Sequence, residues 1–189
     1  AQAQGTVDVL FRYSPEEGAV RSFVPGSFNN WGNNSSGVIQ PWDGSLMTPD
    51  ATIDGYPFSY KVITLPVGGG ETTVGGSSGY TYKFHEHRNS SGSSYVWLAD
   101  PLNATIVGEY GNSFVEITHP MIFQTEPADG ALVNVDPPAL VAFVGGIAGD
   151  PIDAGESEVR LNGVPVGAFS SFYDAERELL YVPASEVVG

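Results

Sequence analysis

The side chains in this sequence best suited to hold a ligand by surface contact are its three tryptophans. Trp31 stands in the stretch GSFNNWG (26–32), where asparagine and glycine neighbours are typical of a loop or a strand end. Trp97 lies in an alternating run, which puts it on the face opposite Val96 without deciding which face is core. Trp42 is either a third stacking surface or a local hydrophobic plug. For Trp31 and Trp97, the alternative is an ordinary tryptophan buried in a β-sandwich.

Two of the three histidines flank one glutamate in the motif His85-Glu86-His87. Alternate side chains of a strand share a face, so both imidazoles point the same way, at a spacing that some zinc sites use. Two ligands are too few for such a site, and only His119 with nearby acids is available to complete it. We therefore expect no metal ion here.

Acidic residues gather in two turn-like stretches, GDPIDAGESE (149–158) and FYDAERE (172–178). Neither has the Asp-x-Asp-x-Asp-Gly spacing of a calcium loop, so solvated turns are the favoured interpretation. No pair of carboxylates stands out as a glycosidase pair, and no Gly-x-Ser-x-Gly nucleophile motif occurs. An eight-fold α/β barrel does not fit in 189 residues. We expect no catalytic residues and no cofactor.

The overall charge is strongly negative, with 22 acidic against 7 basic residues and a formal net charge of −15. Such a chain repels phosphate backbones and anionic membrane surfaces, which argues against nucleic acid as a partner. The longest apolar runs fall short of 18 residues, so membrane insertion is not expected.

The absence of cysteine excludes disulfides and thiolate metal sites but does not name a compartment. The small and polar start AQAQGT (1–6) has two interpretations, a mature end left by signal-peptide cleavage or an arbitrary chain start. The first favours a secreted or cell-surface protein of bacterial type, which is our expectation.

The elements expected to position these side chains are short β-strands. Glycine (24) and proline (14) recur too often to leave a clean helical window. The segments 67–79 and 89–94 are rich in glycine and serine and are expected at the ends of hairpins. The pattern predicts an all-β antiparallel sandwich, with strands at 6–13, 19–26, 58–67, 80–88, 94–100 and 112–119.

A new pattern begins at His119-Pro120 and predicts a second small sandwich. Its clearest signal is Asn162-Gly163, a pair typical of a type I′ hairpin because both central residues need positive φ. We expect two immunoglobulin-like domains in tandem, 1–119 and 120–189. The second ends before its sheet is expected to close, so either the natural chain continues or another chain supplies a strand.

The first domain resembles the glycogen-binding and isoamylase N-terminal domains, carbohydrate-binding module family 48, of the early-set immunoglobulin-like sandwiches. The resemblance covers most of residues 6–118. It is carried by VDVLFRYSPEEGAVRSFVPGSFNNWG (7–32), YTYKF (80–84), WLADPLN (97–103) and GNSFVEI (111–117), which occur in the family's order.

This resemblance implies a sugar site at Trp31, Lys83, Trp97 and Asn112, with Tyr110 at a neighbouring position. In glycogen-binding members the two tryptophans form a stacking platform for α-1,4-linked glucose, and the lysine and asparagine bind hydroxyls. Such a site suits a pyranose, which has an apolar face of C–H groups and neutral hydroxyls around its rim. For the lysine, a plain surface role is the alternative.

The sequence departs from the family pattern beside the expected site. The segment 32–59 is longer than usual, and the two glycine/serine-rich segments are insertions that either extend the groove or cover it. In many bacterial amylase-family enzymes the equivalent domain packs on the catalytic barrel and binds no sugar. The second domain is similar to bacterial immunoglobulin-like modules, which serve as spacers or adhesive units.

Together these patterns favour a non-catalytic α-glucan-binding unit, the N-terminal part of a longer carbohydrate-active protein. The alternative is a structural surface protein, such as a filament, layer or adhesin subunit, that assembles with itself or with a protein partner through its second domain. A third interpretation is a domain that only supports an absent catalytic barrel.

Overall fold

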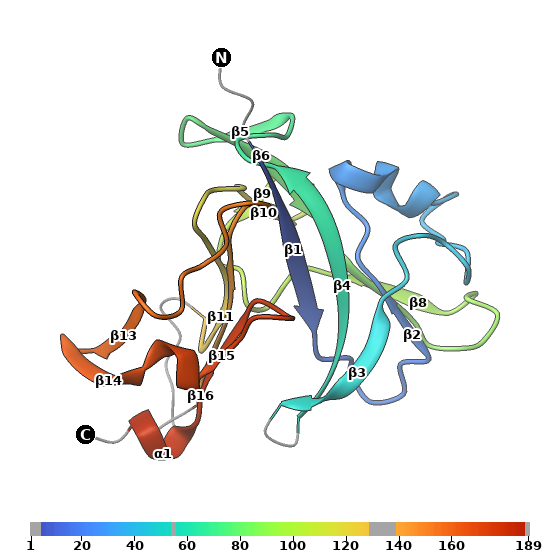
Figure 1. The fold of residues 1–189 in the computed structure, drawn as a ribbon. Helices are drawn as coiled ribbons and strands as arrows, with labels where there is room; N and C mark the ends of the chain where they lie inside the picture. The colour runs from blue at the N-terminus through green and yellow to red at the C-terminus, as the bar shows by residue number, and fades with distance from the viewer. Residues whose placement is uncertain (1–4, 54–55, 129–138, 188–189) are drawn as a thin grey trace.

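The computed structural model describes residues 5–53, 56–128 and 139–187, and it is all-β with antiparallel sheets (Figure 1). In the N-terminal part the sheet orders are β1-β4-β3, β5-β6-β10-β9 and β2-β7-β8. The strands are β1 (Thr6–Tyr13), β2 (Arg21–Phe23), β3 (Thr48–Ile53), β4 (Tyr56–Pro66), β5 (Thr72–Val74), β6 (Ser77–Tyr82), β7 (Phe84–His87), β8 (Tyr95–Leu98), β9 (Ile106–Val107) and β10 (Asn112–Val115).

The C-terminal part has one sheet of order β11-β12-β16-β15 and a separate hairpin, β13-β14. Two 3-10 turns, η1 (Ser27–Asn33) and η2 (Phe169–Ser171), and the short helix α1 (Ala184–Val187) complete the described elements. No helix in the described ranges is both long and apolar enough to traverse a bilayer. The strands are β11 (Met121–Glu126), β12 (Leu140–Gly145), β13 (Glu158–Leu161), β14 (Val164–Ala168), β15 (Tyr173–Asp174) and β16 (Leu179–Val182).

The expected strands are present, with shorter ends in most cases. β1 covers its predicted range and pairs along its whole length with β4, from Thr6 opposite Pro66 to Tyr13 opposite Ser59. The predicted strand 80–88 is divided at Lys83, whose backbone N–H donates to the carbonyl of Pro25 instead of to a neighbouring strand (2.9 Å). The division lets one run of sequence serve two sheets.

The three expected hairpin ends are confirmed, and residues 89–94 join the paired strands β7 and β8. Asn162 and Gly163 have φ of 50° and 81°, as a type I′ turn needs, and Leu161 pairs with Val164 across them. The glycine-rich insertion forms the β5-β6 hairpin, where Gly75 and Gly76 have φ of 60° and 96°. Glycine tolerates these angles because it has no Cβ.

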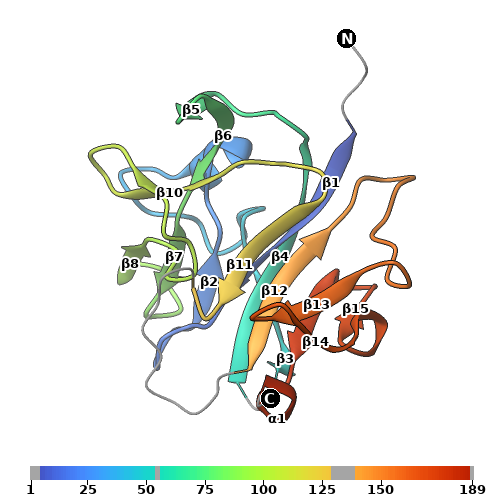
Figure 2. The same ribbon diagram turned by 90° about the vertical axis from the view of Figure 1, so that its left-hand side faces the viewer.

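The hydrophobic core continues across the expected domain boundary at His119. Phe123 of β11 packs edge-on against Phe11 of β1 and Tyr82 of β6, with ring centroids 5.4 Å and 6.1 Å apart. Phe143 of β12 belongs to the same cluster. Figure 2 shows β11 and β12 running beside β1 and β4. The two expected domains stay a prediction, but the described strands on either side of the boundary share one core.

A buried polar network joins the same elements. The backbone N–H of Arg12 donates to Oε1 of Gln124 (2.6 Å), and Nε2 of Gln124 donates to the Arg12 carbonyl (2.8 Å) and to Oδ2 of Asp100 (2.7 Å). Asp100 also accepts from the hydroxyl of Tyr82 (2.6 Å). These bonds tie β1 and β6 to β11 through groups that are inaccessible to solvent.

Candidate functional site

The alternation of β7 separates two different environments. Phe84 stacks on Tyr13 of β1, with ring centroids 4.4 Å apart, and Glu86 accepts a hydrogen bond from the Tyr13 hydroxyl (2.7 Å). These side chains face the core. His85 and His87 project from the opposite face, as the sequence pattern predicts.

On this outer face, cross-strand pairing places residues of β2 and β8 on either side of each histidine of β7. His85 lies between Phe23 of β2 and Trp97 of β8, and His87 lies between Arg21 and Tyr95. Directly opposed residues of an antiparallel pair point to the same side of the sheet. We call this surface the histidine face; its members are Arg21, Phe23, His85, His87, Tyr95 and Trp97.

Trp97 is half-buried on the histidine face. Its ring meets His85 edge-on, with centroids 4.6 Å apart, and its Nε1 donates to the carbonyl of Gly37 (2.9 Å). The polar edge of the indole is therefore already occupied by the segment that follows η1. The structure places Trp97 neither in the central core nor fully in solvent.

Trp31 is held by an unusual turn in η1 and is also half-buried. Asn30, Trp31 and Gly32 all have left-handed backbone angles, with φ of 51°, 55° and 65°. Such angles are unfavourable for residues with a Cβ and persist only where neighbouring contacts impose them. Asn29 supplies those contacts, because its Oδ1 accepts from the backbone N–H of Gly26 (2.8 Å) and of Gly32 (3.3 Å).

Lys83 and Asn112 are both half-buried. Lys83 lies between β6 and β7, next to Tyr82 and Phe84 of the central core, so alternation favours an outward side chain on the side of His85 and Trp97. Asn112 begins β10, next to the buried Ser113, which pairs with Tyr82. Alternation therefore favours one outward side for Trp97 and Lys83, whereas Asn112 and Trp97 belong to different sheets.

The most exposed aromatics lie in loops. Tyr110, in the turn between β9 and β10, is 73% exposed, and Trp42 is 79% exposed. The plug interpretation of Trp42 is therefore wrong, and its indole is open to a ligand. Its neighbours Gln40, Pro41, Asp43 and Gly44 were the available signal, because a run of turn residues seldom surrounds a core tryptophan.

The segment after η1 covers the histidine face rather than extending it. Ser35 and Val38 exchange backbone hydrogen bonds (2.9 and 3.0 Å), and Gly37 lies against Trp97 and the Tyr95 hydroxyl. Ile39 is completely buried. We call residues 34–39 the cover. The cover belongs to the long segment 32–59 and lies over this part of the sheet. Whether the two glycine/serine-rich segments extend or cover the expected groove stays a prediction.

Burial dominates the electrostatics beneath the cover. Loss of water and, to a smaller extent, the neighbouring His87 together lower the pKa of His85 from 6.5 to about 4, and the Gly37 carbonyl acts in the opposite direction. The pKa of His87 is lowered by burial and by Arg21, with the Ile39 carbonyl opposing. Both imidazoles are neutral near pH 7.

Metal binding at these histidines gains no support from the described residues, which contain no group of three or more metal-ligating side chains. His119 does not join them; its Nε2 lies 3.0 Å from Oδ2 of Asp150 in the C-terminal part.

The acidic stretches form capped turns. Oδ1 of Asp153 accepts from the backbone N–H of Gly155 (2.9 Å) and Glu156 (3.2 Å), and Asp174 caps the following turn in the same way. These carboxylates satisfy turn donors, as expected of solvated turns.

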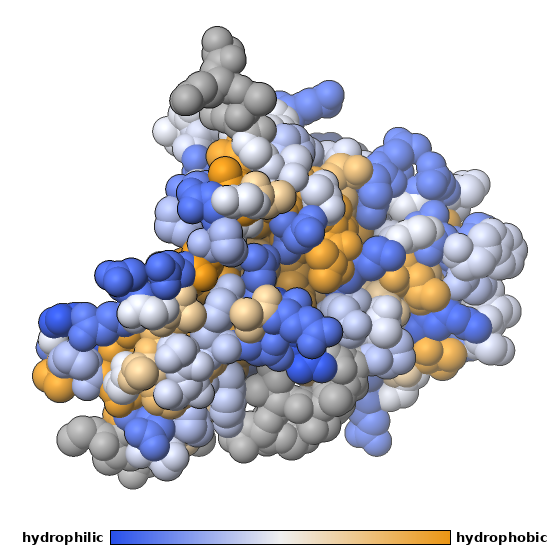
Figure 3. All heavy atoms as spheres, viewed as in Figure 1, coloured by the Kyte–Doolittle hydropathy of each residue, from blue (hydrophilic) through white to orange (hydrophobic). Residues whose placement is uncertain are grey.

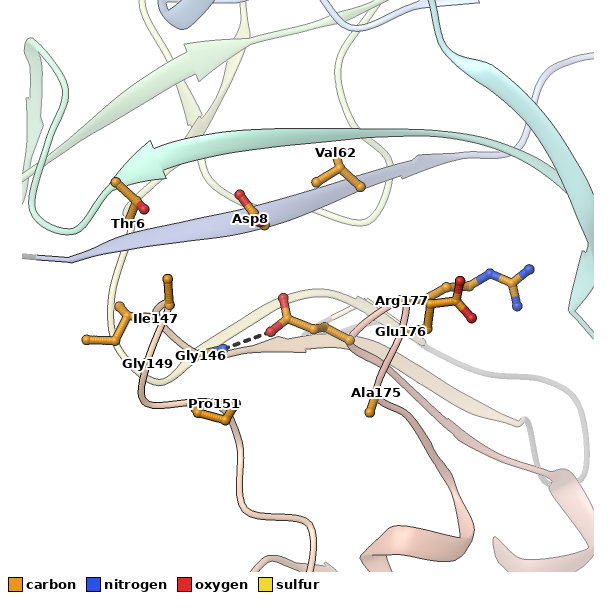
Figure 4. A pocket seen from close by; sticks show the side chains of 12 residues that line it. Thr6, Asp8, Val62, Gly146, Ile147, Gly149, Pro151, Ala175, Glu176 and Arg177 are labelled. Atoms are coloured by element: carbon orange, nitrogen blue, oxygen red, sulfur yellow. Dashed lines mark hydrogen bonds between the residues drawn. The ribbon is translucent and has the colours of Figure 1, made fainter.

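A cleft of about 370 Å³ separates β1 and β4 from the C-terminal sheet (Figure 4). Asp8 and Glu178 face each other across it, and burial together with Asp8 raises the pKa of Glu178. Its wall includes Val62, which is 46% exposed, and in the space-filling view apolar surface lies over this part of the molecule with hydrophilic side chains around it (Figure 3). None of the predicted sugar-contacting residues lines this cleft.

Comparisons of the chain with protein-family models, with characterised proteins and with solved structures found no match.

Proposed function

We propose that this chain is a non-catalytic carbohydrate-binding unit that recognises α-glucans through its two half-buried tryptophans. The observation that carries the proposal is the place of Trp97 on the outer side of β8, with alternation favouring the same side for Lys83. Trp31 lies in η1, after β2 of the same sheet as Trp97, and is held in a specific turn by Asn29. In this proposal these three residues and Asn112 border one sugar-binding region.

The chemistry of these groups fits a neutral sugar. An indole presents a flat apolar surface to the C–H face of a pyranose, while an ammonium group and an amide bind hydroxyls at its rim. The net charge of −15 does not oppose such a ligand, because glucose units carry no charge. Affinity is expected to change little with salt, in contrast to binding of a polyanion.

Trp42 is a further indole that we include in the proposal. Its indole is 79% exposed, so it is available for stacking without any rearrangement, whereas the N–H of Trp97 already donates to Gly37. We assign first contact to Trp42 and a deeper subsite to Trp97. In this proposal the chain is secreted or displayed on the cell surface as part of a longer carbohydrate-active protein.

Calorimetric titration with maltoheptaose and glycogen tests the proposal. Wild type is expected to bind, and Trp31→Ala and Trp97→Ala are each expected to weaken binding about tenfold, in line with a stacking contribution near 1.4 kcal/mol. Glu156→Ala, at an exposed position of the C-terminal part, is the control variant. Absence of binding by folded wild type would refute the function, and unchanged binding by both tryptophan variants would refute the site.

A second candidate function, self-assembly in a surface structure, is favoured by exposed apolar side chains of the C-terminal part. Ile122 lies on the edge strand β11 and is 69% exposed, and Val164 on β14 is 65% exposed. Edge strands with exposed apolar residues are suited to pair with another chain. Light scattering over a concentration series tests this candidate, and Ile122→Lys is expected to abolish any assembly that uses β11.

A further inference from the structure

The two histidines beneath the cover are buried without hydrogen-bond partners. His85 and His87 are both 0% exposed, their ring centroids are 5.2 Å apart, and none of their four ring nitrogens has a partner with normal hydrogen-bond geometry. Buried polar groups are nearly always paired, so such a cluster calls for an explanation.

The surroundings of the pair are aromatic and offer no negative charge. The rings of Phe23 and Trp97 approach His85 at 5.7 and 4.6 Å, and Tyr95 stacks on it at 5.2 Å. From the turn between β7 and β8, the backbone of Gly92 lies so close to His87 that a Cβ there would be 2.7 Å from the ring.

The charged groups near the pair also disfavour a positive imidazole. Arg21 of β2 is the cross-strand partner of His87 and lowers its pKa. Glu86 lies on the other face of β7, where it binds Tyr13 and lies 2.7 Å from Nη2 of Arg88. The cover contributes no ionisable side chain, only the carbonyls of Gly37 and Ile39.

We propose that the cover, residues 34–39, is an acid-operated lid: protonation of His85 and His87 displaces it from the histidine face and uncovers Trp97. A charged imidazole needs water or a counter-charge, and the closed face supplies neither. Opening supplies water at the cost of few hydrogen bonds and of the burial of Ile39. That the lid controls sugar access to Trp97 rests on the proposed function. That the lid opens in acid does not depend on that function.

The cover is the element best placed to yield. Asn34, Ser35 and Ser36 are exposed, and a single side-chain hydrogen bond, from Trp97 to Gly37, fastens the cover to β8. On the other face of β7, Tyr13 and Phe84 are buried in the central core. Relief of the buried charge is therefore cheaper by opening outward than by separating the sheets.

The size of the effect follows from proton linkage. With a pKa of about 4 when covered and 6.5 when exposed to water, His85 binds protons more strongly in the open state below pH 6.5. At pH 5.0 this difference raises the opening equilibrium constant about 30-fold over its value at neutral pH. His87 adds an effect in the same direction.

Amide hydrogen exchange measured by NMR tests the lid directly. The Ser35 and Val38 amides donate to each other's carbonyls within the cover, so their protection reports its opening. Their protection factors, corrected for intrinsic exchange, are expected to fall about 30-fold between pH 7.5 and 5.0. Amides of β1 and β4 are expected to keep theirs.

The double variant His85→Phe/His87→Phe keeps two aromatic rings and removes both titrations, so its cover is expected to show no pH dependence. Constant protection in wild type, an equal fall in the double variant, or a simultaneous loss of protection throughout β1 and β4 would each overturn the lid. If the double variant does not fold, the ring NMR signals of wild type replace it. Imidazoles that titrate near 6.5 while the cover stays protected would contradict the proposal.

Sugar binding is measured separately, so the two proposals fail in different ways. Maltoheptaose is titrated at pH 7.5 and 5.0, with tighter binding expected at pH 5.0. A lid that opens without sugar binding at either pH would refute the proposed function and leave the lid intact. Equal binding at both pH values with an opening lid would refute its control of access.

Discussion

Asp100 and the His85–His87 pair are both buried, but they differ in the number of hydrogen-bond partners that their polar atoms have. Oδ2 of Asp100 accepts from Tyr82 and Gln124, and Oδ1 accepts from the backbone N–H of Leu102 (2.8 Å). The histidines have no such partners. The comparison shows that burial disfavours the charged form at both sites, but that Asp100 has three hydrogen-bond donors to offset part of this cost while the histidine rings have no partner of normal geometry.

Burial shifts the pKa values of the two sites in opposite directions for one reason, because it disfavours the charged form of each group. Burial raises the pKa of Asp100, and the hydrogen bonds from Tyr82 and Gln124 oppose that rise. For His85 the Gly37 carbonyl opposes burial only in part, and the pKa stays near 4. The core network therefore offsets part of the cost of burying a carboxylate, whereas the buried outer face disfavours protonation of its histidines.

The largest effect is expected from breaking the paired site. Asp100→Ala removes the acceptor for Tyr82 and Gln124 and leaves two buried donors unsatisfied, which costs about 3 kcal/mol or more of unfolding free energy. Urea denaturation at pH 7.5 measures it. Glu109→Ala, an exposed acid in the β9–β10 turn, is expected to stay within about 0.5 kcal/mol of wild type. Equal values for the two variants would contradict the importance of the network.

The next largest effect is expected from acid, which should lower the unfolding free energy through His85. Because the pKa of His85 is lower in the folded state, the stability it contributes is present above pH 6.5 and is lost as pH falls toward 4. From pH 7.5 to 5.0 wild type should lose up to about 2 kcal/mol through this residue. This is an upper bound, because an open lid lets the histidine take up its proton before the core unfolds.

His85→Phe is expected to lose correspondingly less stability over the same range, as measured by urea denaturation at both pH values. Identical pH dependence in wild type and variant would show that the histidine is not the acid-sensitive group.

A smaller effect is expected at the cover itself. Gly37 has φ of +87°, and a Cβ there would lie 3.2 Å from the Tyr95 hydroxyl, so Gly37→Ala should loosen the cover by about 1 kcal/mol. Faster exchange of the Val38 amide at pH 7.5 is the readout. Gly44→Ala is the matched control, because nothing lies within 4 Å of a Cβ at that position. The same exchange rate in both variants would argue against the tight contact.

The smallest effect on stability is expected at Trp42. Since its side chain is 79% exposed, Trp42→Ala should change the unfolding free energy by less than about 0.5 kcal/mol. In the proposed function the same variant binds maltoheptaose up to about tenfold more weakly. Calorimetry with both ligands and a denaturation curve distinguishes the two outcomes. A large loss of unfolding free energy would show that Trp42 stabilises the fold and would contradict this prediction.

Sequence reasoning succeeded where the information is local. The angles of Asn162 and Gly163, the strand over 6–13 and the shared side of His85 and His87 all follow from turn chemistry or alternation. It left Trp42 open between a plug and a stacking surface, although the turn residues around it favour exposure. It did not foresee that residues 34–39 cover the sheet, because that depends on contacts with β8, about sixty residues away in the chain.

The sequence by itself determined an all-β architecture, the main hairpins and the set of side chains that strand periodicity puts together, because these depend on neighbours a few residues apart. Only the tertiary structure decided that Tyr13 and Phe84 face the core, that the cover lies over His85 and His87, and that one core runs past His119. Those outcomes depend on packing between distant segments. Alternation separates the two faces of a strand, but only the elements packed against the strand decide which face is buried.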